Sequence, residues 1–468
     1  MQARLALLGV LGVAQALLYV LGSGTSPSQQ LLAVACAAVL GTIALVWIAL
    51  DQSFQQTPLW FVLALALLLR LIAVQATPLL EDDYFRYLWD GLQTATKLDP
   101  YRYPPDHFFG HADLSKSWQD VLSGINHPEV PSIYGPVLQG LFALAYWINP
   151  GQVGAIQGLL LVVDMLTMAL LARFQAGPRW LLVYAMHPLV LKESMASAHP
   201  DILLGFFLVC ALLAWRKHRA VFTGFFLALA SGTKVPALVA VAFLIFKPRL
   251  SPGFGPKLTW ILTLAAALFI TLAFIYLPFL LQGANEGSAL AVFGSRWRFN
   301  PLLFRIIEPV FEWAFLLNLL SEFRPEFVSS WGPKLSRLTA AFILGAGTVA
   351  LLWRWVKLNQ PNKPNQLRWP PLALAIALLL LLSPTVNPWY WLWALAPSIL
   401  MRQYTFAIAG CVGLLSYWNT SVIAISAVWI VPNGLGQNSV PAIAAWIQIV
   451  VIGAAWIVDC RNASNDKQ

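Results

Sequence analysis

The sequence predicts an all-α protein that crosses a membrane many times. Hydrophobic residues make up 59% of the 468 residues and charged residues only 10%, whereas a soluble protein has about 25% charged residues. Apolar runs near the roughly 20 residues that a membrane-spanning helix needs recur along the whole chain. These two observations predict a polytopic bundle of about a dozen transmembrane helices, several of them short.

The apolar runs fall into two length classes. The longer ones are 5–21, 31–50, 59–76, 154–172, 258–281 and 440–458. The shorter ones are 134–148, 180–191, 201–215, 220–232, 235–246, 335–353, 371–383, 392–401 and 404–431. Short helices are tolerated where protein or a watery cavity satisfies the backbone, so they favour an internal cavity over a simple anchor. Either 134–148 or 180–191 is expected to be a half-helix, and 220–246 is either one tilted helix or two short ones.

Two long polar loops divide the chain. With the N-terminus inside, three spans place loop 77–133 on the outer face, and a second outer loop covers 282–334. The Asn- and Pro-rich stretch 359–368 reads as a cytoplasmic linker. It would separate a catalytic membrane module, 1–358, from a more variable C-terminal membrane module, 369–468.

The net charge of +9 is split between several short loops. Clusters lie at 216–219, 247–257 and 354–368, as the positive-inside rule predicts for cytoplasmic loops. This distribution does not form the stripe that nucleic-acid binding needs, so membrane lipids are the expected partners and nucleic acid is not. The first apolar run is followed directly by further runs, so we expect a retained helix rather than a signal peptide.

Three consecutive carboxylates follow the third run: Glu81, Asp82 and Asp83. Acidic residues number only 20 in the chain, so three together at a membrane boundary stand out. Adjacent carboxylates repel and lose water near a membrane, and both effects raise their pKa values, which suits a proton acceptor near neutral pH. The structural alternative is a solvated loop ending in an N-cap that opens a helix.

Polar residues at membrane depth are the next candidates, because burying them there is costly. His187, Lys192, Glu193, His199 and Asp201 surround two short apolar pieces, with Lys192–Glu193 also readable as a structural ion pair. Lys234 interrupts an apolar run and calls for an anion such as a phosphate.

Three further residues in or between apolar stretches carry weaker signals. Trp389 and Tyr390 lie between two apolar stretches, where an ordinary aromatic belt is the alternative. Asp164 is more readily explained as a packing partner.

Outward carboxylates combined with scattered cations suggest that an acid deprotonates an acceptor hydroxyl while cations stabilise a departing lipid phosphate.

Several motifs resemble the GT-C superfamily of glycosyltransferases, and more narrowly its bacterial mannosyltransferase-like members, with a distant similarity to GPI mannosyltransferases. The most specific is Asp82–Gly91 followed by Asp99–Pro105, which resembles the first outer loop. Later elements agree in order: Tyr134-Gly135-Pro136-Val137, His199-Pro200-Asp201, Thr233-Lys234-Val235-Pro236 and Ser383–Tyr390. The sequence departs at Asn387, where the pattern has His, and at Gly135, where it has Pro.

The resemblance implies a GT-C-type bundle with a helical first extracytoplasmic loop. It also implies an inverting transfer of a hexose such as mannose from a polyprenyl-phosphate donor to a glycan, lipid or glycolipid acceptor. The active site would face outside, with the bacterial inner membrane as the expected location. Some members use a divalent metal, but this pattern offers no ligand set for one.

Roles are carried over by position. Asp83 is expected to be the general base, with Asp82 as its partner or alternate. The donor phosphate would be bound by Arg86, Lys234, His199, Arg296 and Arg298. Substrate binding would involve Glu81, Tyr87, Asp90, Tyr134, Asp201, Trp389 and Tyr390.

Two other function classes remain at this stage. A transporter or flippase of lipid-linked sugars predicts matched broken helices in two halves, and no internal repeat is apparent. A non-catalytic scaffold leaves the three acids and Lys234 unexplained.

Overall fold

The protein is an all-α polytopic membrane protein, as the sequence predicts. The computed structural model describes residues 1–174, 176–246, 254–283, 286–312, 325–359, 368–418 and 442–465. In these residues β structure is limited to one isolated bridge between Phe299 and Thr385. Six helices of the described chain are long and apolar enough to span a membrane, and seven shorter apolar helices of 10–17 residues accompany them.

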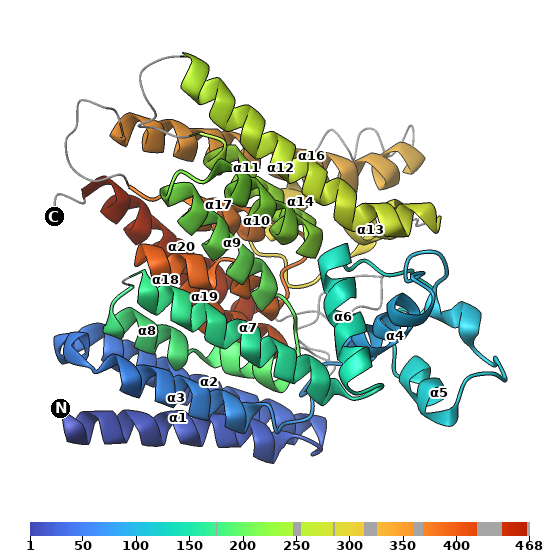
Figure 1. The fold of residues 1–468 in the computed structure, drawn as a ribbon, viewed down its shortest axis with the longest axis horizontal. Coiled ribbons are helices and arrows are strands. Elements are labelled where there is room, and N and C mark those ends of the chain that lie inside the picture. Colours follow the sequence, from blue (N-terminus) through green and yellow to red (C-terminus); the bar gives the residue numbers. More distant parts are fainter. Residues whose placement is uncertain are drawn as a thin grey trace.

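The chain begins with three helices that pack together: α1 (Gln2–Gly22), α2 (Pro27–Leu50) and α3 (Leu59–Ala73). Proline at the first position of α2 fits a helix start, since its missing N–H has no intrahelical partner there. The Gln29 side chain then accepts the backbone N–H of Ser26 at 3.2 Å. These three helices place the following polar loop at the end of the bundle opposite the N-terminus (Figure 1).

The first polar loop is itself helical, as expected. It contains α4 (Asp83–Thr96) and α5 (Lys116–Ser123), which lie together at one end of the molecule beside α6 (Figure 1). Buried Asp90 on α4 accepts hydrogen bonds from Ser132 and, at 3.0 Å, from Gln139. This buried network ties the end of the loop to α4 and fixes the direction in which α6 starts.

The central bundle consists mostly of shorter helices. In chain order they are α6 (Pro136–Ile148), α7 (Val153–Arg173), α8 (Pro178–Ala185), the π-helical turn η3 (Val190–Ala196), α9 (Ile202–Arg216), α10 (Ala220–Thr233), η4 (Val235–Leu238) and α11 (Val239–Leu244). Both α6 and α8 are too short to span a membrane alone. The stretch 220–246 is two short helical pieces rather than one, because α10 ends at Thr233 and Lys234 is extended before Pro236.

The rest of the described chain completes the bundle. Its helices are α12 (Phe254–Leu281), α13 (Glu286–Arg296), α14 (Phe304–Glu312), α16 (Pro325–Leu358), α17 (Leu372–Leu382), η5 (Pro388–Leu392), α18 (Leu395–Met401), α19 (Thr405–Gly413), η6 (Leu414–Tyr417) and α20 (Ala442–Asn465). Apart from its two end residues, the predicted linker 359–368 lies outside the described residues, as does 313–324 of the second outer loop.

A buried ion pair joins three of the helices. Arg70 on α3 donates to Asp164 on α7 at 2.6 Å, and both side chains are fully buried. Tyr184 on α8 donates to the same carboxylate at 2.7 Å, and Arg70 also donates to the Ala185 carbonyl. Asp164 is therefore a packing partner, as expected, and it holds α3, α7 and α8 in register.

Candidate active site

A cavity of about 660 Å³ lies beside the start of α4. This volume falls within the roughly 300–1,000 Å³ of small-molecule sites. Residues far apart in the sequence line it, among them Gln30, Leu80, Glu81, Asp82, Asp83, Arg86, Asn126, His127, Val130, Tyr134, Lys234, Trp297, Arg298, Asn387, Trp389, Tyr390 and Tyr417. The cavity therefore combines carboxylates, cations and aromatic rings.

Asp82 and Asp83 form one edge of this cavity. Asp82 precedes α4 and Asp83 is its first residue, so the start of a helix fixes both side chains. Asn126 Nδ2 donates to Asp82 Oδ1 at 2.5 Å and to Asp83 Oδ1 at 3.3 Å. The Tyr134 hydroxyl donates to Asp83 Oδ2 at 3.4 Å. The structural and the functional interpretation of these acids are therefore compatible. The acids stand at the start of a helix, and they also line the cavity.

The surroundings of these acids favour the protonated form relative to a solvated carboxyl. Burial raises the pKa of Asp83, and the neighbouring charge of Asp82 raises it further. Burial also raises the pKa of Asp82, while its hydrogen bond from Asn126 works in the opposite direction. A carboxylate with a raised pKa is a stronger proton acceptor, which is the property that a general base needs.

Lys234 follows α10 and lines the same cavity. Its Nζ is 2.8 Å from Asp201 Oδ1 and 4.8 Å from the centre of the Tyr390 ring, and 15% of its side chain is exposed. The anion that the sequence predicts for Lys234 is therefore present within the protein itself, in the carboxylate of Asp201. Lys234 still lines the cavity, so its remaining donors can reach a ligand.

Three arginines predicted to bind phosphate have different surroundings. Arg298 lines the cavity and pairs with Glu308 of α14. Arg86 also lines it, but its guanidinium donates to the carbonyls of His127 and Val130 at 2.9–3.1 Å. It thereby holds the segment that carries Asn126. Arg296 ends α13, and its side chain lies outside the described part of the structure.

Four other predicted residues lie behind the cavity wall rather than on it: Tyr87, Asp90, His199 and Asp201. The Tyr87 hydroxyl pairs with His199 Nδ1 at 2.9 Å, and Trp389 stacks on His199 with ring centres 3.8 Å apart. Asp201 receives hydrogen bonds from Lys234 and, at 2.5 Å, from Trp393. These residues support the wall that Tyr134, Lys234 and Trp389 present to the cavity.

The sequence reasoning missed several cavity residues: Gln30, Asn126, Trp297 and Tyr417. Asn126 follows the short amphipathic helix α5 in the first polar loop, and nothing in its local pattern distinguishes it. Tyr417 comes from η6, far along the chain. Only the folded bundle brings these residues to Glu81–Asp83.

The two departures from the resembled motif have local consequences. A Cβ atom at Gly135 would lie 2.2 Å from the Gly232 carbonyl oxygen, so α6 starts against the end of α10 only with glycine there. Asn387 lines the cavity, where its amide can donate and accept hydrogen bonds without titrating. Among the described residues, no three His, Cys, Asp or Glu side chains gather closely enough to hold a metal ion.

Comparison with known proteins gives the family. Residues 6–248 match the family model described as "Alpha-(1->6)-mannopyranosyltransferase, N-terminal domain". Over 366 residues the chain is 22% identical to alpha-(1->6)-mannopyranosyltransferase A of Mycobacterium tuberculosis, covering 73% of this chain and 65% of the relative. No solved structure matches. Because the family model matches more than half of the chain, from α1 to beyond Lys234, the protein belongs to the alpha-(1->6)-mannopyranosyltransferase N-terminal domain family, as its first outer loop predicts.

Proposed function

We propose that this protein is a membrane mannosyltransferase that uses a polyprenyl-phosphate mannose donor and an extracytoplasmic hydroxyl acceptor. The acceptor would be a glycan, a lipid or a glycolipid. The observation that carries the proposal is a single cavity lined by the acids Asp82 and Asp83 together with the cations Lys234 and Arg298. Family membership and the printed activity of the mycobacterial relative support the sugar.

In the proposed reaction, Asp83 accepts the proton of the acceptor hydroxyl. The acceptor oxygen then forms a bond to the anomeric carbon while the bond from that carbon to the phosphate oxygen breaks. The electron pair of the broken bond leaves with the polyprenyl phosphate. Attack from the face opposite the phosphate inverts the anomeric carbon, so an α linkage would require a β-linked donor.

The cations of the cavity would stabilise the leaving group. Negative charge grows on the phosphate as its bond to the sugar breaks, and Lys234 and Arg298 can offset that charge. Each is also paired with a carboxylate, Asp201 or Glu308, which holds the cation in place before the donor arrives. Tyr390 and Trp389 supply an apolar wall beside Lys234.

Location and orientation follow from the same proposal. A donor with a long apolar tail remains in the membrane, so its phosphate must be met at the membrane boundary. The loop that bears Asp83 follows three helices and lies opposite the N-terminus (Figure 1). With the N-terminus inside, this loop and the cavity face the extracytoplasmic side, in a bacterial inner membrane.

Transfer in a purified system tests the proposal. The protein is reconstituted in liposomes with an oligosaccharide acceptor and a panel of polyprenyl-phosphate sugars, and released polyprenyl phosphate is measured. We expect release with the mannosyl donor and an α-linked product. Movement of the donor between leaflets without release would instead identify a flippase.

A further inference from the structure

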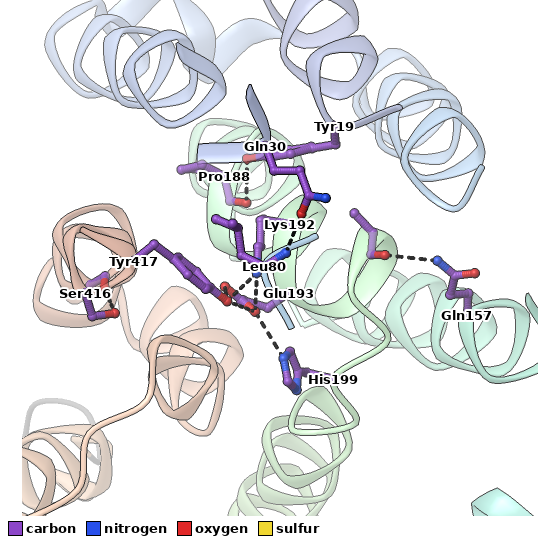
Figure 2. Close-up of polar contacts among 12 residues, drawn as sticks. Tyr19, Gln30, Leu80, Gln157, Pro188, Lys192, Glu193, His199, Ser416 and Tyr417 are labelled. Atoms are coloured by element: carbon purple, nitrogen blue, oxygen red, sulfur yellow. Dashed lines mark hydrogen bonds and ion pairs between the residues drawn. The ribbon is translucent and has the colours of Figure 1, made fainter. Parts of the chain in front are cut away.

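Glu81 lines the cavity, but the proposed reaction gives it no task. The residue before it, Leu80, has a φ of +58°. That left-handed conformation costs a side-chain-bearing residue roughly 1–2 kcal/mol, so neighbouring contacts must hold it. Gln30 of α2 does so, because its side-chain oxygen accepts the Leu80 N–H at 2.9 Å (Figure 2). This hydrogen bond fixes the backbone conformation of Leu80, directly before Glu81.

A buried polar cluster adjoins the part of the cavity that Glu81 lines. Tyr417 lines the same cavity and presents its hydroxyl to this cluster. The same hydroxyl bonds to Glu193 at 3.0 and 3.1 Å and to the ammonium of Lys192 (Figure 2). His199 Nε2 lies 3.5 Å from Glu193 on the opposite side. Lys192, Glu193 and His199 are fully buried, so the cluster is rigidly packed.

The charges of this cluster bear on the state of Glu81. One ammonium, on Lys192, faces two carboxyl groups, on Glu81 and Glu193. Burial raises the pKa of Glu81 well above its ordinary value, and Asp83 and Glu193 add to that rise while Lys192 opposes it. A neutral carboxylic acid both donates and accepts hydrogen bonds, which is the pairing that a sugar hydroxyl offers.

We propose that Glu81, whose backbone Gln30 holds through Leu80, binds hydroxyl groups of the donor sugar, at a subsite separate from the phosphate-binding Lys234. This inference rests on the proposed function, since it assumes a sugar-bearing lipid in the cavity. Glu81 stands two residues before Asp83, and both line the same cavity. A ring between the phosphate and the base would therefore lie within reach of Glu81, with Trp389 as an apolar surface.

Equilibrium binding of two radiolabelled lipids in detergent tests the subsite. The lipids are polyprenyl-phosphate mannose and polyprenyl phosphate, which differ only in the sugar. A hydrogen bond to the sugar predicts that Glu81→Ala weakens binding of the mannosyl lipid about threefold to tenfold. Binding of polyprenyl phosphate should change less than about twofold, because Glu81 does not touch the phosphate. Glu81→Gln should restore most of the loss, since an amide also donates and accepts.

Matched variants make the result specific. Lys234→Ala should weaken binding of both lipids. Asp113 is an exposed acid of the same loop as Glu81, and Asp113→Ala should weaken binding of neither lipid. Tyr417→Phe removes a hydroxyl from the cavity lining that Glu81 shares, and it should weaken binding of the mannosyl lipid alone. This variant keeps the test open if Glu81→Ala does not fold. Equal effects of Glu81→Ala on both lipids, or no effect on either, overturn the subsite. Failure of wild-type protein to transfer mannose in the liposome assay overturns the proposed function instead.

Discussion

Lys234 Nζ lies 2.8 Å from Asp201 Oδ1, joining the end of α10 to the residue that precedes α9. Trp393 donates to the same carboxylate oxygen at 2.5 Å. Three segments that are distant in sequence thus meet directly behind the cavity wall. Asp201 holds the ammonium in place and offsets part of its charge before a ligand arrives.

Lys234→Ala should raise the donor KM and lower kcat/KM by about tenfold to a hundredfold, because charge-assisted hydrogen bonds contribute about 1.5–3 kcal/mol. Released polyprenyl phosphate at varied donor concentration measures both constants. Lys116→Ala, at an exposed cation of the polar loop 77–133 outside the cavity lining, serves as the control. If donor KM and kcat stay unchanged in Lys234→Ala, the lysine is a packing residue.

The pH dependence of kcat/KM should have an acidic limb set by Asp83. The base works only when deprotonated, so activity falls as pH drops through its pKa. Burial and the charge of Asp82 raise that pKa, which places the limb above the ordinary value of about 3.9. Asp82→Asn removes the repulsion and should move the limb to lower pH. Asn126→Ala removes a hydrogen bond that lowers the pKa and should move it to higher pH. If neither substitution moves the acidic limb, the limb belongs to a group other than Asp83.

Arg70→Ala should destabilise the protein by about 3–5 kcal/mol, because it leaves the buried carboxylate of Asp164 without its cation. The double variant Arg70→Met with Asp164→Leu should lose less free energy of unfolding, since it removes both charges together. Denaturant unfolding in detergent measures the free energy of both variants. Equal losses in the single and double variants would show that the ion pair is not what orders α3, α7 and α8.

Gly135→Ala should lower both stability and activity, because its Cβ would lie 2.2 Å from the Gly232 carbonyl oxygen. Relief of that overlap requires α6 to move away from α10, and Tyr134 and Lys234 lie beside this contact. Gly140→Ala provides the matched control, since a Cβ there meets nothing within 4 Å. Thermal unfolding and transfer assays on both variants check the expectation, which fails if Gly135→Ala matches Gly140→Ala.

Local sequence signals predicted much of the fold. Apolar length and composition located the membrane helices, and the three acids marked the start of α4. They did not fix every length: the long run 59–76 forms a helix of only 15 residues, and the short run 335–353 lies within the 28-residue apolar helix Trp331–Leu358. The break at Lys234 was left open between one helix and two, because Pro236 disfavours a continuing helix without excluding a kinked one. The structure shows two short pieces.

The candidate site was only partly predictable. Asp82, Asp83 and Lys234 line the cavity as the sequence suggested, but their roles stay predictions. The pairing of Lys234 with Asp201 and the arrival of Tyr417 beside Glu81 depend on tertiary packing. No local pattern encodes such contacts. For the same reason, only the hydrogen bonds of Asn126 to both acids identify it as a residue of the candidate site.

The most direct measurement of the central claim is mannosyl transfer by Asp83→Asn in liposomes, beside Asp113→Asn as a surface control. Loss of the base should reduce kcat by about a hundredfold to ten-thousandfold, while binding of polyprenyl phosphate and the unfolding temperature stay close to wild type. Transfer by Asp83→Asn within a few-fold of wild type would contradict the assignment of Asp83 as the proton acceptor.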